Sequence, residues 1–496
     1  KRKPRSLAAQ KECEVSMIPI RQALDGFLQL LVDLHQALSE AQDFATLEKK
    51  IAAAVRTCAC GLLAGALESL DEQLAANRDK TRWKPVNRKA RTVVTIVGEV
   101  TYWRRYYVDP QTGERRFLLD ERLGIAERQR LSPGLREQAV TLAMEMSYRR
   151  AAKVLSQWVP AITAMAVWQE LQRAGEAERQ QAAASRERVF ERGQVPEGRR
   201  QVRQLCVEAD GVMIRARDAE GERKHMEVKL AVAYEGKRPT AQGRQALVER
   251  RLVGGVIEGP AFWEEAVVEW GRTWDWRSVE RCWLGTDGAA WAKKGVELLP
   301  GAVHRLDGFH LRRALLRALG REQEAYGAVC AALEAEDWGQ VEAALKEAER
   351  GSGARGKERI QELRKYLRQN WDGIVGSGAA ASLGAIEGQV FHTVARRMKR
   401  HGARWSVRGA DHLVRVIVAR ANGKPLVWQS KQAGGSAEGR KEARLCPSEG
   451  ERLMRKQRAA GEWLEARLPA LVGPHAWRAW VQYGLREIVR SPVTMA

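Results

Sequence analysis

The run Arg203–Gly211 (RQLCVEADG) constrains the fold more than any other stretch, because its apolar alternation stops at a carboxylate. Leucine, valine and alanine occupy every second position from Leu205 to Ala209, which is the period of a β-strand. Asp210 follows, and Gly211 could let the chain turn. Such an aspartate serves either as a turn residue or as a rigidly held metal ligand. The rest of the chain bears on this choice.

The residues after Gly211 predict a mixed sheet with helices on both faces. Strand-like runs follow at Met226–Tyr234, Arg251–Ile257, Arg281–Asp287 and Ala302–Leu306. An amphipathic helix begins at Pro260, between the second and third of these runs. Three strands, a helix and then alternating strands and helices are typical of this α/β architecture. Asp287 ends one strand, so its carboxylate converges on Asp210 if the two strands are neighbours.

Residues 311–378 are almost entirely helix-forming and predict a helical insertion before the next core element. The following stretch, 385–404, begins with Glu387 and then becomes strongly basic. A helix there would bring a third carboxylate to the site and a row of cations to flanking DNA; a solvated basic helix is the alternative. The candidate phosphate contacts are Arg396, Arg397, Lys399, Arg400 and Arg404. Trp405 either stacks on a splayed base or packs under the helix.

The charge balance points to a polyanionic partner. The 496 residues carry a formal charge of +22 and a pI near 10, and nucleic acid is the commonest partner of such a chain. No run approaches 18 consecutive apolar residues, so we expect no bilayer span. The N-terminal KRKPRS has no apolar signal region. The seven scattered cysteines fit a reducing compartment, so we expect a cytoplasmic protein that is nucleoid-associated when bound to DNA.

The N-terminal third predicts DNA-binding and packing elements rather than chemistry. Two apolar stripes within 18–77 predict a helical hairpin, which packs either on its own domain or on a second subunit. Residues 92–108 predict a β-hairpin, in which Arg104 and Arg105 stand among aromatic residues and either contact DNA or lie on a solvated face. Residues 132–174 predict three short helices, read either as a helix-turn-helix or as plain three-helix packing.

Three carboxylates, Asp210, Asp287 and Glu387, can therefore be assembled on one RNase H-like sheet. Their hard oxygen ligands suit Mg²⁺ or Mn²⁺. Two such ions can activate a water or a 3′-hydroxyl and stabilise the leaving oxygen in phosphoryl transfer. This chemistry needs no nucleophilic side chain, and the sequence shows no persuasive Ser/His/Asp set, P-loop or Rossmann glycine pattern.

Short motifs in this order resemble the ISLre group of bacterial insertion-sequence transposases, which is related to the Mutator-like DDE transposases. In the second half they are EADG (208–211), GTDGAAW (285–291), LDGFH (306–310), IEGQV (386–390) and RRMKRHGARWS (396–406). In the first half they are VGEVTYWRRYY (97–107), FLLDERLGI (117–125) and SYRRAAKVL (147–155). The resemblance covers about residues 90–420. The chain departs from the family picture in having no N-terminal cysteine zinc module.

The resemblance implies a DDE triad at Asp210, Asp287 and Glu387, with the helical insertion before the glutamate. It also implies that Asp307 and His310 correspond to a Cys/Asp-x-x-His signature, with His310 near the active site; packing at a helix start is the alternative for His310. The expected regions are a helical region at 1–90, a β-hairpin region at 91–130, a helix-turn-helix-like domain at 131–175, a linker at 176–201, a core at 202–310 and 379–420 around the insertion at 311–378, and a loop with C-terminal helices at 421–496.

We therefore expect an α/β RNase H-like core joined to a mainly α DNA-binding region, in a transposase that cuts and joins the ends of its element. The expected partners are double-stranded DNA, with no membrane, and a second copy of the chain. The rivals are a structure-specific nuclease on the same fold and a non-catalytic DNA-binding regulator.

Overall fold

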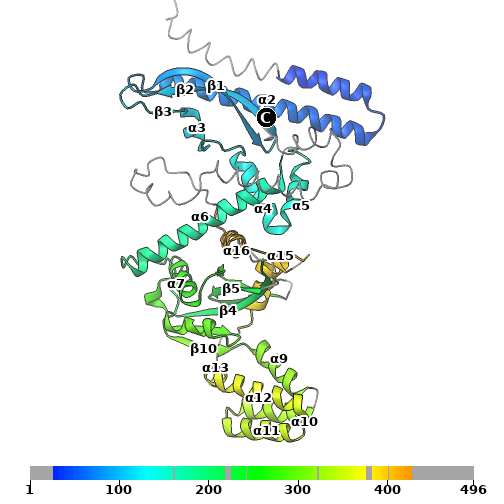
Figure 1. Ribbon diagram of the computed structural model, residues 1–496, viewed down its shortest axis with the longest axis vertical. Helices are drawn as coiled ribbons and strands as arrows, with labels where there is room; N and C mark the ends of the chain where they lie inside the picture. Colours follow the sequence, from blue (N-terminus) through cyan, green and yellow to red (C-terminus); the bar gives the residue numbers. More distant parts are fainter. Residues whose placement is uncertain are drawn as a thin grey trace, which may run out of the picture. The chain divides into compact units, whose positions relative to one another are not determined.

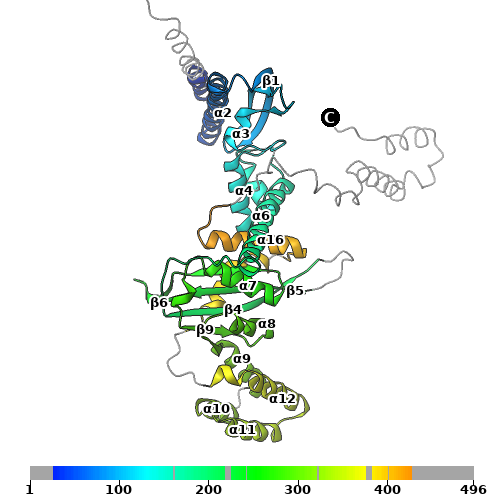
Figure 2. The same cartoon turned by 90° about the vertical axis from the view of Figure 1, so that its left-hand side faces the viewer.

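The structure is a computed structural model that describes residues 26–159, 162–217, 225–241, 243–320, 323–375, 383–399 and 402–426. Its central element is a five-stranded mixed sheet in the order β10-β9-β4-β5-β8 (Figures 1 and 2). The strands are β4 (Gln204–Arg215), β5 (His225–Tyr234), β8 (Arg251–Gly255), β9 (Arg281–Thr286) and β10 (Ala302–Leu306). Strands β9 and β10 run parallel to β4, whereas β5 is antiparallel to β4 and β8. The predicted mixed sheet is confirmed.

Strand β4 is buried on both faces, and its alternation assigns Asp210 to one of them. Leu205, Val207 and Ala209 belong to the core formed with helix α7 (Gly259–Trp270). Cys206, Val212 and Ile214 belong to the opposite core, formed with helix α16 (Val407–Ala421) and its neighbours. Because side chains alternate along a strand, the even-numbered Glu208 and Asp210 face the α16 side. The strand continues five residues past Asp210 because β5 pairs with it as far as Arg215.

Helix α6 differs from the predicted short helix and linker. It runs unbroken over Ala164–Phe190, because its alanine, glutamate, glutamine and arginine residues are strong helix formers. Its buried side, including Val167 and Leu171, joins the same hydrophobic core as α16. Gly175 lets His412 approach closely, since a Cβ at this glycine would lie 2.3 Å from the His412 Cβ. Helices α4 (Pro133–Glu145) and α5 (Tyr148–Leu155) also contribute to this core.

The N-terminal part contains the predicted helices and the predicted hairpin. A helix at residues 26–40 precedes α2 (Phe44–Asn77), and β1 (Lys84–Thr95) pairs with β2 (Gly98–Val108). Strand β1 begins eight residues before the hairpin predicted at residues 92–108. Short elements β3 (Arg115–Arg116) and α3 (Leu118–Leu123) follow. By length and composition alone α2 could cross a membrane, and 6% of the residues in its most apolar 18-residue window are buried; polar residues interrupt the helix, so the sequence contains no unbroken apolar run there.

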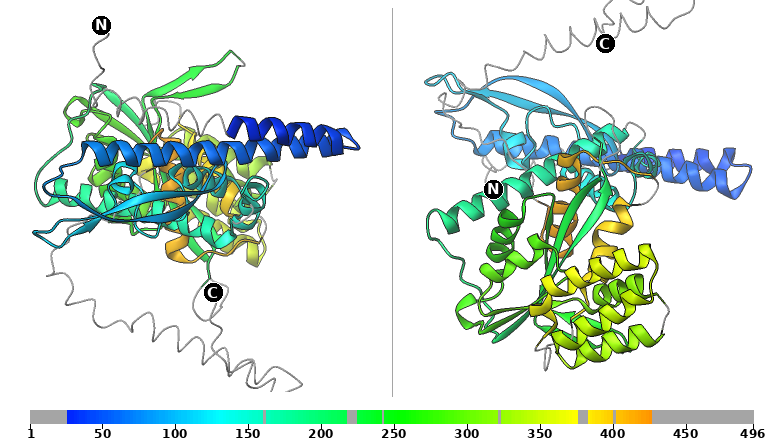
Figure 3. Two further views of the ribbon diagram at one scale, coloured as in Figure 1. Left: turned by 90° about the horizontal axis from the view of Figure 1, so that it is seen from above. Right: turned by 60° about the horizontal axis from the view of Figure 1, so that its bottom comes forward.

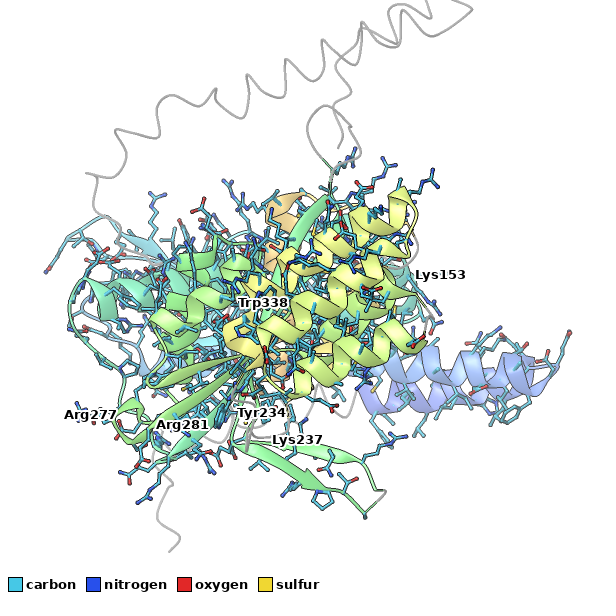
Figure 4. All side chains as sticks on the ribbon, turned by 90° about the horizontal axis from the view of Figure 1, so that it is seen from below. Lys153, Tyr234, Lys237, Arg277, Arg281 and Trp338 are labelled. Carbon is cyan, nitrogen blue, oxygen red and sulfur yellow. The ribbon has the colours of Figure 1, made fainter. Side chains whose placement is uncertain are left out.

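The predicted insertion is helical and has its own hydrophobic core (Figure 3, right). Its helices are α9 (Gly308–Leu319), α10 (Gln323–Glu334), α11 (Trp338–Arg350), α12 (Ala354–Gln369) and α13 (Trp371–Ile374). A two-stranded hairpin, β6 (Gly236–Pro239) and β7 (Gln245–Val248), was not predicted. Figure 4 labels Trp338 among the insertion helices and Lys237 on this hairpin. The loop and helices predicted beyond residue 426 lie outside the described residues.

Candidate active site

Three aspartates lie in a row across three neighbouring parallel strands. The last paired positions of β4 and β9 are Ala209 and Thr286, and Thr286 also pairs with Leu306 of β10. Asp210, Asp287 and Asp307 are each the next residue along their strands. The backbone N–H of Asp307 donates to the carbonyl of Thr286 at 2.7 Å, which fixes this alignment. The sheet register therefore brings together Asp210 and Asp287, as the sequence predicted.

Asp210 is buried, with 9% of its surface exposed. Burial, the charge of Asp287 and, least, the charge of Glu387 together raise the pKa of its carboxyl to about 6, against a hydrogen bond from the Gly211 N–H and the nearby His310. Like charges that face one another disfavour joint ionisation. Negative charge is therefore concentrated at this site. The surrounding protein compensates it only in part, and this contributes to the raised pKa of Asp210.

Asp287 is held by the turn that follows β9 and by the insertion. Its Oδ1 accepts from the Ala289 N–H at 2.9 Å, and Gly288 has φ +91°, which a non-glycine residue rarely adopts. The Tyr366 hydroxyl, on α12, donates to the Asp287 carbonyl at 2.9 Å. The insertion therefore supports the backbone that carries this carboxylate.

Asp307 and His310 form a pair at the start of α9. The Asp307 carboxylate caps the helix by accepting from the Phe309 N–H, and its Oδ2 lies 2.7 Å from His310 Nδ1. This bond raises the pKa of His310, and the charges of Asp210 and Asp287 add to that effect although burial opposes it. His310 therefore lies within electrostatic reach of both aspartates. Burial raises the pKa of Asp307, but the bond from His310, the backbone N–H bonds and the charge of His310 together outweigh it, so the pKa lies below its ordinary value.

Glu387 lies in the first turn of α14 (Ile386–Val390), where its side chain is exposed. A π-helical turn at Phe391–Ala395 and α15 (Arg396–Met398) continue this helix; π-bulges are frequent at functional sites. The charge of Glu387 makes the smallest contribution to the raised pKa of Asp210, and among the described residues Glu387 is not gathered with the two aspartates into one group of ligands.

Glu208 ties the Glu387 segment to β4, and sequence reasoning missed it. This carboxylate is 1% exposed and accepts from the N–H groups of Gly384, Ala385 and Ile386 at 2.8 to 3.3 Å. The Tyr234 hydroxyl also donates to it, at 2.6 Å. Lys237 adds a bond to the Leu383 carbonyl at 3.1 Å; Figure 4 labels both Tyr234 and Lys237. The available signal was a glutamate two residues before Asp210 in a buried strand.

The donor chemistry of the site fits a divalent cation, although the described side chains are not gathered around one point. Among the described residues, no group of three His, Cys, Asp or Glu side chains is gathered so that it could hold an ion as it stands. The triad offers only carboxylate oxygens, which Mg²⁺ and Mn²⁺ prefer. The raised pKa of Asp210 is the observation that supports the fit, because it arises from burial and then from the charge of Asp287, and a bound cation would stabilise the ionised carboxylate against both.

The structure corrects several of the predicted DNA contacts. Arg104 is 9% exposed and pairs with Asp120 beneath the hairpin, so its charge is already used inside the fold. Arg105 pairs with Asp71 of α2 at 2.7 Å. Arg397 donates to the Ala143 carbonyl at 2.8 Å and its guanidinium lies over Trp405 and Tyr148. All three cations thus already interact with neighbouring residues of the protein.

The remaining candidates divide between packing and exposure. Trp405 is buried and donates to the Met398 carbonyl at 3.1 Å, so it packs under the helix rather than presenting a stacking face. Arg396 is exposed and pairs with Glu145. Lys399 and Arg404 are exposed, and the described part of the chain offers them no ion pair. Arg400 lies outside the described residues.

A second basic surface occurs on the helices predicted as a helix-turn-helix. Arg149, Arg150 and Lys153 are exposed on α5, and Figure 4 labels Lys153 at the edge of the molecule. Trp158 and Trp168 are 46% and 40% exposed beside the first turns of α6. Cations beside exposed aromatic rings suit a nucleic-acid surface.

Comparisons with known proteins define the family. Residues 37–432 match the model of the uncharacterised protein family UPF0236. A UPF0236 protein of Caldanaerobacter subterraneus subsp. tengcongensis is 25% identical over 374 residues, which cover 74% of this chain and 77% of the relative. A UPF0236 protein in the vanSb 3′ region of Streptococcus gallolyticus is 25% identical over 413 residues, or 80% of this chain and 87% of the relative. The chain therefore belongs to the uncharacterised protein family UPF0236.

Proposed function

We propose that this protein is a metal-dependent DDE DNA transposase of the ISLre type, with Asp210, Asp287 and Glu387 as its catalytic carboxylates. The observation that carries the proposal is the strand register, which aligns Asp210 with Asp287, together with the Glu208 bonds that hold the Glu387 segment against the same strand. Residues far apart in sequence thereby converge on one edge of the sheet. Such an arrangement suits phosphoryl transfer that uses no protein nucleophile.

The topology supports an RNase H-like core. A strand with an antiparallel pair on one side and two parallel strands on the other, in the order β10-β9-β4-β5-β8, is the arrangement expected for this core. Asp210 and Asp287 lie where the parallel pairing of β4 with β9 ends, which is the usual position of ligand sites in open α/β sheets. The helical insertion precedes the glutamate, as the resemblance implies.

In this mechanism the chain's own residues would hold the metal ions and position the DNA. Asp210, Asp287 and Glu387 would hold two Mg²⁺ or Mn²⁺ ions, which when bound supply Lewis-acid activation of the attacking and leaving oxygens. His310, oriented by Asp307, would donate a hydrogen bond to a phosphate oxygen or to the leaving strand. Tyr366 and Glu208 keep the Asp287 and Glu387 backbones in register. Lys399 and Arg404 would contact flanking phosphates.

DNA-end recognition is assigned to α5 and α6 instead of the buried hairpin arginines. The exposed Arg149, Arg150 and Lys153 would contact phosphates, while the exposed face around Trp168 would lie against a groove. We place this activity in the bacterial cytoplasm, on nucleoid DNA. The names of two C. subterraneus relatives join four and eleven gene labels from one genome; repeated coding sequences are what a mobile element leaves behind.

The N-terminal helical hairpin is proposed as the contact with a second copy. It exposes large apolar side chains along both helices, including Phe27, Leu31, Leu38 and Phe44, which are 48% to 80% exposed. Lys50 pairs with Glu40 at 2.6 Å and fixes the two helices to each other. Exposed apolar patches of this extent mark interaction sites, and joining two DNA ends requires at least two catalytic units.

The test is strand cleavage and strand transfer by the purified chain. The substrates are labelled duplexes that carry the DNA ends flanking the gene, with Mg²⁺ or Mn²⁺. Wild type is compared with Asp210→Ala, Asp287→Ala and Glu387→Ala, and with Glu358→Gln, an exposed α12 carboxylate, as the control. We expect the triad variants to bind the ends but to lose cleavage and joining, while the control retains both.

Two results would redirect the proposal. Cleavage without joining would favour a nuclease on the same fold. Tight end binding without metal-dependent cleavage, unchanged in all three triad variants, would refute the enzyme and leave a DNA-binding regulator.

A further inference from the structure

One face of helix α9 (Gly308–Leu319) is exposed, basic and partly aromatic. The exposed large side chains on this face are Phe309, Arg312, Arg313, Leu316 and Arg317. Their spacings of three and four residues place them along a single stripe. The opposite face, with Leu315 and Leu319, is buried in the core of the insertion. The stripe is therefore a solvent-facing surface of a well-anchored helix.

The arginines of the stripe have no acidic partner among the described residues. Helix α9 contains no Asp or Glu, and Arg312, Arg313 and Arg317 make no ion pair in the described part of the chain, in contrast to Arg364 of α12, which pairs with Glu342 and Glu349. Exposed cations without an ion pair among the described residues also occur on α5 and α12, so the feature that distinguishes α9 is that its three arginines share one stripe with an exposed aromatic ring beside the carboxylate site. Three cations over two helical turns match a chain of phosphates.

The stripe begins at the carboxylate site. Phe309 neighbours His310, and the two rings meet edge to face with centroids 5.5 Å apart. His310 in turn is held by Asp307 and lies within electrostatic reach of Asp210. From Phe309 to Arg317 the helix rises about 12 Å, at about 1.5 Å per residue, which is the length of roughly three to four base steps at about 3.4 Å each.

Phe309 has both an exposed ring and open space beside it. The side chain is 50% exposed, and Phe309 and Arg312 line a hollow of about 580 Å³ whose other walls include Leu333 and Ile374. An aromatic ring of this kind offers a stacking platform to a base that has left the duplex, because every base has a π-face. A continuous duplex keeps its bases stacked and would leave the ring unused.

We propose that the α9 stripe binds an unpaired DNA strand as it leaves the carboxylate site. Phe309 stacks on a base next to the scissile phosphate, and Arg312, Arg313 and Arg317 contact the following phosphates. Leu316 covers apolar sugar or base surface between them. This inference rests on the proposed transposase function. It assigns the path of the DNA strand at the same site to helix α9, a part of the insertion that lies outside the triad.

The experiment measures DNA binding by the full chain without metal, so that it is independent of cleavage. The probes are a fluorescein-labelled 20-nucleotide single strand, a duplex of the same sequence, and a duplex whose single-stranded tail carries 2-aminopurine. The variants are Phe309→Ala, Phe309→Trp and the triple change of Arg312, Arg313 and Arg317 to Ala. The matched control changes three exposed α12 cations, Arg355, Lys357 and Arg359, to Ala.

We expect the triple arginine variant to lower the slope of log affinity against log salt for the single strand by about 2, since each single-strand phosphate contact contributes about 0.7. Phe309→Ala is expected to weaken single-strand binding about tenfold and to abolish 2-aminopurine quenching, whereas Phe309→Trp retains both. Duplex affinity changes little in the Phe309 variants. The α12 control keeps the wild-type slope.

Three outcomes separate the ideas. If the stripe variants match wild type and the control in single-strand affinity, salt slope and quenching, the inference is overturned, even if wild type cleaves its ends. If wild type fails to cleave while the stripe variants lose single-strand binding, the transposase fails but the surface stands. If Phe309→Ala and the arginine variant weaken duplex and single strand equally, the surface is a general DNA contact and the stacking role is rejected.

Discussion

Replacing Asp210 with Asn is expected to stabilise the metal-free protein at neutral pH. The Asp210 carboxyl has a pKa of about 6 because it is buried beside Asp287 and Glu387, against about 3.9 for a free aspartate. At about 1.4 kcal/mol for each pKa unit, the ionised carboxylate lowers the free energy of unfolding by about 3 kcal/mol. Asp210 is 9% exposed, so solvent screening discounts this figure little. The neutral amide has nearly the same shape and removes the penalty.

The pH dependence follows from the direction of the shift. Below pH 4 the carboxyl of Asp210 is protonated in both the folded and the unfolded chain, so it affects stability little. Between pH 4 and 6 the folded chain holds more protons than the unfolded chain, so the free energy of unfolding falls as pH rises. Above pH 6 the whole penalty is present. The advantage of Asp210→Asn over wild type is therefore expected to grow from near zero at pH 4 to about 3 kcal/mol at pH 8.

The assay is chemical denaturation in EDTA across this pH range, followed by circular dichroism, with Glu358→Gln as the control. Adding Mn²⁺ at pH 8 is expected to narrow the difference, because a ligand that binds the folded state stabilises it and the variant lacks one ligand. The reasoning is refuted if Asp210→Asn is no more stable than wild type at pH 8, or if its advantage is the same at pH 4.

Two further predictions concern the support of the site and the subunit contact. Glu208→Ala leaves the Tyr234 hydroxyl and the N–H groups that begin α14 without their buried acceptor. We therefore expect denaturation to show a free energy of unfolding lower by about 3 kcal/mol and titration calorimetry to show weaker Mn²⁺ binding. Mn²⁺ affinity equal to that of wild type would contradict this role. Leu31→Glu combined with Leu38→Glu is expected to halve the mass measured by light scattering. Ile96→Glu, at the exposed turn of the β-hairpin, is the control and should leave the mass unchanged. A mass that does not change in the double variant would show that the helical hairpin is not the dimer contact.

Strand periodicity is a local signal, so the sequence was sufficient to place Asp210 and Asp287 on strands, whereas the structure shows that the two strands are neighbours. Alternation placed Asp210 on a strand, and the run ending at Asp287 was a second strand whose register could align with it. Glu208 was invisible to the same reasoning, since its partners, Ala385 and Ile386, are more than 170 residues away. A carboxylate inside an apolar strand signals a buried partner without identifying it.

The basic residues were harder to assign because composition does not reveal which of the charged side chains form ion pairs inside the fold. Arg104 alternates with aromatic residues as a DNA-contacting arginine would, yet Asp120 of α3 neutralises it inside the fold. Trp405 was expected either to stack or to pack, and the structure places it in the core. Conversely, most of the α9 stripe lies in the segment that the sequence predicted only as a helical insertion. The pattern of helix-forming residues there did not show which face of the helix would be exposed.

A chain with a charge of +22 carries the carboxylates Asp210, Asp287 and Glu387 near one end of the strands of its central sheet, and this contrast has a consequence for DNA binding. Carboxylates repel a phosphate, so the scissile phosphate needs added positive charge to approach Asp210, Asp287 and Glu387, whereas the cations of α5 and α9 attract phosphates without it. We therefore expect the chain to bind DNA ends without divalent metal but to protect the scissile phosphate from chemical footprinting only when Mg²⁺ or Mn²⁺ is present. Protection that appears equally in EDTA would mean that the phosphate does not lie at the carboxylates, and the triad would then need another role.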